Sequence, residues 1–149
     1  MFRYLPIFIT FIHNTAIIFI GVPLKNGDQI VGAMTCTFYS NFLSNDISDL
    51  KYFNNGHSYI LSGDGTIIAS DNLDDVTNAV NVINDTENYP ELEEMLQVHK
   101  NMIAGESNFE KLSDKYVTYT TIDGLDGWSI GLKVDSKYVD KEKGVIVTL

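Results

Sequence analysis

The sequence predicts an α+β fold in which helices pack on a five-stranded antiparallel sheet. Two short apolar stretches, residues 58–61 and 66–69, flank a turn cluster at 62–65 that contains Asp-Gly, which is typical of a tight β-hairpin. A helical pattern lies on each side of this hairpin. Three more strand-like stretches then follow, joined by loops so short that neighbouring strands must run antiparallel. This order of elements indicates one sheet with helices on it.

Two other strand-like stretches, residues 16–23 and 29–39, precede these elements. Asn26-Gly27 between them is a strong signal for a hairpin turn. This first hairpin has no helix of its own. We therefore expect its other partners either to be missing or to lie in residues 1–15.

The first helix is expected at residues 40–54, with Ser40 as its cap and Gly56 beyond its end. Apolar residues recur there at intervals of three and four, which gives a helix one buried face. They are Leu43, Ile47, Leu50 and Phe53. The polar residues 71–88 that follow the central hairpin predict a loop with a short helical turn.

The second helix is expected at residues 90–104, because Pro90 suits a first turn and Gly105 suits the position after the end. Its predicted apolar face is Leu92, Leu96, His99 and Ile103, with Met95 and Met102 beside it. His99 in this setting favours a packed histidine over a metal ligand.

The last three strands are expected at residues 107–112, 115–122 and 128–134. In the last of them, apolar and small or polar residues alternate, which indicates one buried and one open face. We expect five residues to be buried against the 90–104 helix. They are Tyr59, Ile67, Trp128, Ile130 and Leu132.

Composition excludes several classes of function. The 149 residues carry a formal net charge of −10, which argues against a nucleic-acid partner. A single cysteine allows no internal disulfide, and three histidines without paired spacing give no metal site. The acidic residues in 71–88 lack the ligand alternation of a calcium loop. We expect no cofactor and no metal.

Catalytic motifs are also missing from the sequence. No Ser/His/Asp set shares a common context, and the Gly-Asp-Gly at 63–65 precedes a strand and not the helix of a phosphate-binding loop. We therefore expect that the chain is not an enzyme.

Three segments together resemble one known family. They are GHSYILSGDGTIIAS (56–70), MIAGES (102–107) and KYVTYTTIDGLDGWSIGL (115–132). They are similar to the membrane-proximal module of double Cache sensor domains, whose sheet is PAS-like. The matching residues are Gly56, Tyr59, Asp64, Gly65, Thr66, Gly127, Trp128 and Ser129. The chain departs from the family at Ser70-Asp71, where members often carry a His-Pro pair.

The resemblance implies a division of the chain into four parts. Residues 16–40 would be a remnant hairpin of the distal Cache module, and 41–139 the membrane-proximal module. Residues 140–149 would begin a truncated transmembrane segment, and 1–15 match nothing in the family. The residues alone leave the apolar end open between a membrane helix and a last β-strand.

The resemblance also implies the function. Such modules lie on the extracytoplasmic side of the cell membrane in chemotaxis receptors, sensor kinases and diguanylate cyclases, mostly as homodimers. The chain is expected to sense, or to relay, the binding of a small molecule to a cytoplasmic output domain. The alternatives are a purely structural spacer without its own ligand and, less in keeping with the residues, a small-molecule-binding enzyme domain.

The family's ligands include amino acids and carboxylates, which mostly bind the distal module through residues that would lie upstream of this chain. A pocket of this module's own is expected between the open sheet face and the 71–88 loop. The candidate ligand-binding residues are Tyr59, Asp71, Tyr116, Tyr119 and Asp123. Each has an alternative as an ordinary packing or loop residue, because tyrosine is common in strands.

Overall fold

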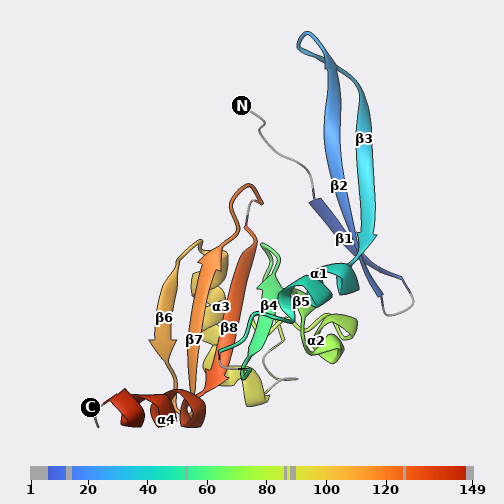
Figure 1. Cartoon of the computed structure of the whole chain (residues 1–149). Coiled ribbons are helices and arrows are strands. Elements are labelled where there is room, and N and C mark those ends of the chain that lie inside the picture. The colour runs from blue at the N-terminus through green and yellow to red at the C-terminus, as the bar shows by residue number, and fades with distance from the viewer. Residues whose placement is uncertain are drawn as a thin grey trace.

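The computed structural model of the chain describes residues 7–12, 15–52, 54–85, 87, 90–125 and 127–146. They form a three-stranded sheet and a five-stranded sheet, with helices packed on the larger one (Figure 1). The α+β class with helices on a five-stranded antiparallel sheet is confirmed.

The larger sheet has the strand order β5-β4-β8-β7-β6, and every pairing in it is antiparallel. The strands are β4 (His57–Leu61), β5 (Ile67–Ser70), β6 (Asn108–Lys111), β7 (Lys115–Thr121) and β8 (Ser129–Asp135). The predicted hairpin therefore forms one edge, and the three later strands form the other. The central junction pairs β4 with β8, with Tyr59 opposite Gly131.

The smaller sheet is built from β1 (Ile7–Ile12), β2 (Thr15–Asn26) and β3 (Gln29–Tyr39). The predicted hairpin turn is confirmed, with Gly27 at φ 61°. β1, which comes from the unassigned first residues, pairs antiparallel with β2. The β2–β3 hairpin extends away from the larger sheet, and α1 (Ser40–Ile47) lies between the two (Figure 1).

The first helix is shorter than predicted, because α1 ends at Ile47 and not at residue 54. Ser48 donates its hydroxyl to the Asn45 carbonyl at 2.7 Å, a local bond that competes with continued helix. Ser40 is the first helical residue and not the cap, which is Tyr39. Leu50 is accordingly 48% exposed, and Phe53 lies outside the described residues.

The second predicted helix is divided. Its first half is the 3₁₀-helix η2 (Pro90–Met95), and α3 (Leu96–Ile103) follows directly. Because a 3₁₀-helix turns every three residues, the buried face is rotated from the one that a continuous α-helix would present. The buried side chains are Met95, Val98, His99 and Met102, while Leu96 and Ile103 are half-buried. The predicted face is therefore confirmed at His99 and in part at Leu96, which packs against the core, although the most deeply buried positions are the neighbouring Val98 and Met102. The Leu92 side chain lies outside the described residues.

The remaining helices are α2 (Leu73–Thr77), which confirms the short helical turn in residues 71–88, and α4 (Ser136–Ile146) at the C-terminal end. Residues 144–146 belong to α4, so a last β-strand there is wrong. Residues 147–149 lie outside the described part of the chain.

The two faces of the larger sheet have separate cores. Tyr59 and Ile67 pack under α3, as predicted, in a cluster with Val98 and Met102. Trp128 instead belongs to a second cluster on the opposite face. That cluster contains Ile18, Ile47, Ile60, Ile68, Ala69 and Trp128, with Ile130 packed against it.

The prediction that Trp128, Ile130 and Leu132 face the helix is therefore wrong. Alternation correctly placed these three on one side of β8, but α3 covers the other side. Gly131 allows the Tyr59 ring to lie against the strand there, since a Cβ at this position would come within 2.6 Å of the ring.

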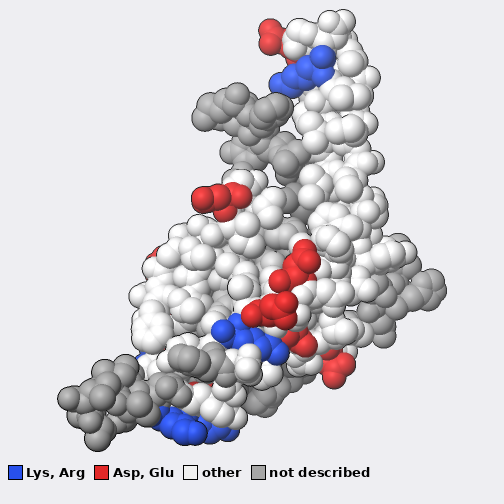
Figure 2. Space-filling model, in the orientation of Figure 1, with Lys and Arg blue, Asp and Glu red and all other residues white. Residues whose placement is uncertain are grey.

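The face opposite α3 stays open over β6, β7 and β8. Thr118, Thr120 and Phe109 are exposed on it. Figure 2 shows that this face and most of the β2–β3 hairpin carry little charge, whereas charged residues gather at the hairpin tip and over the middle of the molecule.

We predict that Trp128→Ala lowers the free energy of unfolding by about 3–5 kcal/mol, because it removes a 5% exposed aromatic side chain and leaves a cavity. Urea denaturation followed by circular dichroism measures the change. Phe109→Ala is the control, since this phenylalanine is 61% exposed and its loss should cost far less. Equal losses in the two variants would contradict the placement of Trp128.

Gly131→Ala should lower the free energy of unfolding by about 1–3 kcal/mol, because the new methyl group collides with the buried Tyr59 ring. Gly32→Ala in β3 is a matched control, since the nearest atom to its new methyl group is 3.8 Å away. That change should be neutral or slightly stabilising. The same denaturation experiment compares the two, and a neutral Gly131→Ala would exclude the close packing.

Candidate functional site

The face under α3 is closed around Tyr59, which is buried. Its hydroxyl donates only a long contact of 3.5 Å to the Met102 sulfur. Burial is the main cause that raises the pKa of this phenol, so Tyr59 is neutral at any physiological pH. Ser129 donates to the Met102 carbonyl at 2.7 Å, which fastens α3 to β8 beside the tyrosine.

His99 lies next to Tyr59, with ring centroids 5.4 Å apart. The side chain is 3% exposed, and its Nδ1 has no hydrogen-bond partner among the described residues. Burial lowers the pKa of His99 to about 4, and the positive charge of Lys133 acts in the same direction. The expectation of a packed histidine is confirmed.

Tyr119 joins α3 to the outer strands. Its hydroxyl donates to the Glu110 carboxylate and accepts from the Asn101 amide at 3.2 Å. Asn101 also donates to Glu110 at 3.3 Å, so the three groups form a closed hydrogen-bonded set. Burial, followed by the bond to Glu110, raises the pKa of Tyr119.

Four ionisable groups gather at the end of this face where β4 begins: His57, Asp71, Asp75 and Lys133. We call them the basal cluster. His57 Nδ1 lies 3.3 Å from an Asp71 oxygen. The Lys133 ammonium lies 5.9 Å from the centre of the Tyr59 ring. Burial raises the pKa of Asp75, while Lys133 opposes that shift.

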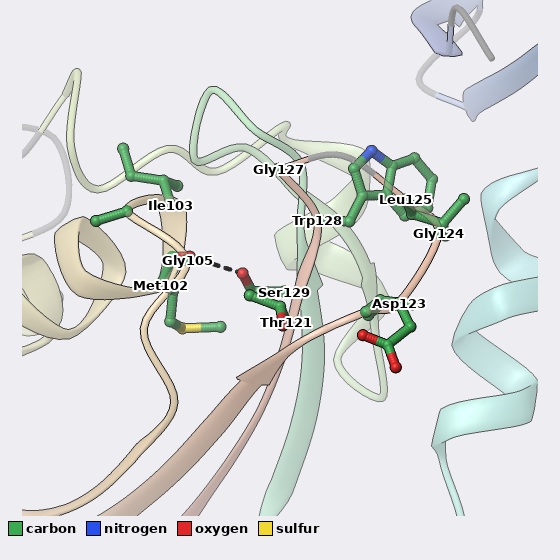
Figure 3. Close-up of a pocket in the computed structure, with 12 residues that line it drawn as sticks. Met102, Ile103, Gly105, Thr121, Asp123, Gly124, Leu125, Gly127, Trp128 and Ser129 are labelled. Carbon is green, nitrogen blue, oxygen red and sulfur yellow. Dashed lines mark hydrogen bonds between the residues drawn. The ribbon is translucent and has the colours of Figure 1, made fainter. Parts of the chain in front are cut away.

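A hollow of about 390 Å³ lies between the end of α3 and the turn from β7 to β8, and Figure 3 shows the residues that line it. Its lining includes backbone of Gly105, Gly124 and Gly127, and the Ser129–Met102 bond crosses it. Asp123 is the ionisable side chain among the described lining residues, and it is exposed. The hollow therefore offers mainly backbone groups, with little charge to select a ligand.

A shallower hollow of about 200 Å³ lies on the opposite, open face of the sheet, at β7 and β8. Leu50 and Leu132 are among its lining residues. Next to this hollow along β7, Tyr116 donates its hydroxyl to Asp140 of α4 at 3.0 Å. This bond ties the sheet to the helix that leaves it.

The structure does not gather the five predicted site residues in one pocket. Tyr59 and Tyr119 lie under α3, and Asp71 lies in the basal cluster. Asp123 lines the hollow of Figure 3, and Tyr116 points to the other face. Sequence reasoning missed Lys133 and Asp75 as members of the basal cluster, although a lysine within the alternating last strand was a signal for it.

No family model matches the sequence, and no curated protein matches it either. Solved structures do match. One is the extracellular domain of a protein assigned as histidine kinase mmHK1S-Z3, with a TM-score of 0.69 and 13% identity over 91% of this chain. The chain has the fold of an extracellular sensor domain. It spans about half the length of that domain, covering 50% of it.

The ligand-binding domains of two chemoreceptors share this fold. The ligand-binding domain of Pseudomonas fluorescens CtaA, solved with L-isoleucine, has a TM-score of 0.60 and 23% identity, covering 91% of this chain and 52% of that one. The ligand-binding domain of Pseudomonas aeruginosa PAO1 PctB, solved with L-Arg, has a TM-score of 0.55 and 21% identity, covering 83% and 50%. Within the described ranges of the present chain, no helix has the length and apolar character to cross a membrane.

Acid should destabilise the protein through His99. The unfolded chain takes up a proton on this residue below about pH 6.5, while the folded chain keeps it neutral down to about pH 4. The free energy of unfolding therefore falls as the pH drops through this window, by up to about 3 kcal/mol. Urea denaturation at several pH values measures the fall, and His99→Phe should remove this part of it.

The control is His57→Gln, which changes an exposed histidine and keeps His99. It should retain the loss of stability that His99 causes in acid. If His99→Phe and the unmodified protein lose stability equally between pH 6.5 and 4, burial of a neutral His99 is excluded.

Proposed function

We propose that the chain is part of an extracytoplasmic sensory module that senses, or relays, the binding of a small molecule to an output domain across the membrane. Its fold supports this, because the matching structures are extracellular domains of sensor kinases and chemoreceptors. The proposal includes a homodimeric parent receptor at the cell membrane, and it includes no catalytic step.

The division of the chain is part of the same proposal. Residues 41–139 form the membrane-proximal module, and 16–40 form the closing hairpin of a distal module. Exposed apolar side chains on β3, such as Ile30, Val31 and Met34, fit a hairpin that has further partners. Residues 140–149 lead toward the membrane. Within residues 1–15, which match nothing in the family, β1 adds a strand to the hairpin.

The main support for a relay is the direct connection between the larger sheet and α4. β8 ends at Asp135 and α4 begins at Ser136, so no linker separates the central strand from the helix that leaves the module. The Ser136 amide donates to the Asp114 carbonyl at 2.8 Å, and Tyr116 bonds to Asp140. A displacement of β8 must therefore move α4, whereas a flexible linker would absorb it.

The ligand that we propose is an amino acid or a related carboxylate. The structures of CtaA were solved with L-leucine and L-isoleucine, and that of PctC with GABA. Whichever ligand drives the shift must bind one of the two receptor states more tightly, since equal affinity for both would move nothing.

The test inserts a Gly-Ser linker between Asp135 and Ser136 in a full-length receptor that carries this module. We expect the output response to the receptor's ligand to disappear while ligand binding is retained, because a flexible joint no longer transmits the displacement. Output activity and binding are measured on the same membranes.

The matched control places the same insertion after Gly27, in the turn between β2 and β3, and leaves the β8–α4 junction intact. It should respond normally. A normal response with the linker after Asp135 would exclude the relay and leave a passive spacer.

A further inference from the structure

The basal cluster holds two opposite charges that influence each other without touching. Burial raises the pKa of the Asp75 carboxyl and the charge of Lys133 opposes this shift, yet no ion pair within 4.0 Å joins the two side chains. Both are half-buried, so each has lost part of its hydration and still faces solvent. A bound group that carries both charges would offset this loss of hydration for the two side chains.

Lys133 lacks a carboxylate in contact among the described residues. The Lys133 ammonium lies over the face of the Tyr59 ring, 5.9 Å from the ring centre. Removing a lysine from water without an anionic partner is costly, and a ligand carboxylate would offset that cost. Lys111 also lies over a tyrosine ring, that of Tyr116, but it is on the opposite face of the sheet and is exposed.

Spare hydrogen-bonding capacity surrounds this lysine. His99 Nδ1 is unpartnered although the side chain is 3% exposed, and the ring lies against the same Tyr59. The Tyr59 hydroxyl donates to the Met102 sulfur at 3.5 Å. Buried polar groups are normally satisfied, so the imidazole, whose Nδ1 has no partner among the described residues, is a second polar group here with capacity to spare.

The acidic side of the cluster is held in place. Asn72 donates its amide to Asp75 at 2.9 Å, and Ser70 donates its hydroxyl to the same carboxylate at 3.5 Å. Asp71 is only 9% exposed and lies against His57. Two carboxyl groups, those of Asp71 and Asp75, thus lie together in the cluster, and they favour an ammonium group beside them.

We propose that the basal cluster is a ligand site of this module's own for a small zwitterion of the α-amino acid class. Lys133 binds the carboxylate, and Asp75 with Asp71 binds the ammonium group. Its residues come from β4, β8, α2 and the segment between β5 and α2, and Lys133 lies near the end of the strand that continues into α4. This inference rests on the proposed sensory function and adds the place and the chemistry of binding.

The test is a thermal-shift and calorimetric titration of the full chain with the common L-amino acids at millimolar concentration. Propionate and ethylamine are included as ligands that carry only one of the two charges. We expect at least one amino acid to raise the melting temperature, because it binds the folded state alone, and neither half-ligand to match it.

Lys133→Met and Asp75→Asn should each weaken that binding about tenfold or more, the loss expected for one charge-assisted hydrogen bond. Asp75→Asn keeps the shape of the side chain, so it remains informative if Lys133→Met folds poorly. The matched controls are Lys111→Met, which removes the lysine over Tyr116, and Asp46→Asn on exposed α1. Both should bind normally.

Three results would overturn the site. An amino acid that binds Lys133→Met and Asp75→Asn as tightly as the unmodified chain must bind elsewhere, and the sensory function would stand. If ethylamine stabilises the chain as much as any amino acid does, the site binds a simple cation and not a zwitterion. If no amino acid changes the melting temperature, the proposed site is excluded. The linker insertion in the receptor would still test the proposed relay independently.

Discussion

The fold depends on the packing of Tyr59 across Gly131, where β4 meets β8. These strands are the centre of the larger sheet, and the tyrosine covers the glycine so closely that no side chain could replace it. α3 packs on this junction through Met102, whose carbonyl accepts the Ser129 hydroxyl. One tyrosine and one glycine therefore determine which face of the sheet the helix covers.

The same two strands also join the other parts of the molecule. On the face away from α3, Ile60 and Trp128 pack with Ile18 of the long hairpin and Ile47 of α1. At its far end β8 continues directly into α4. A path of packed side chains and continuous backbone thus connects the hairpin to the outgoing helix through the central strands. Interior packing is dense enough for such a path to transmit small displacements.

Local signals in the sequence predicted the strands well. Asn26-Gly27 and the Gly-Asp-Gly at 63–65 identified both hairpins, and alternation correctly grouped Trp128 with Ile130. Glycines of the family pattern have a physical role here, since Gly127, at φ 78°, lies against Gly63 and brings the two turns together. The hairpin turns and the alternation along a strand could be predicted because both depend on residues that are close together in the sequence.

What the sequence did not predict depends on contacts between distant segments. The choice of face for α3 follows from Tyr59 and Gly131, which are far apart in the chain. α1 ends earlier than predicted, and the second predicted helix begins as the 3₁₀-helix η2. Each of these differences changes which apolar side chains are buried. The basal cluster likewise forms only when β4, α2 and β8 meet, so its residues carried no local motif.

The central position of β8 has a consequence for how the protein is made. β8 is the last strand in sequence, yet it pairs with both β4 and β7 and holds the two halves of the sheet together. While the chain is being synthesised, the β4–β5 hairpin has to wait for residues near Asp135 before it gains its inner neighbour. Pairings between distant segments form slowly, because the intervening chain must first lose its freedom. Until then the apolar edges of both halves are open to other chains, which makes this interval the point at which the protein depends most on protection from aggregation.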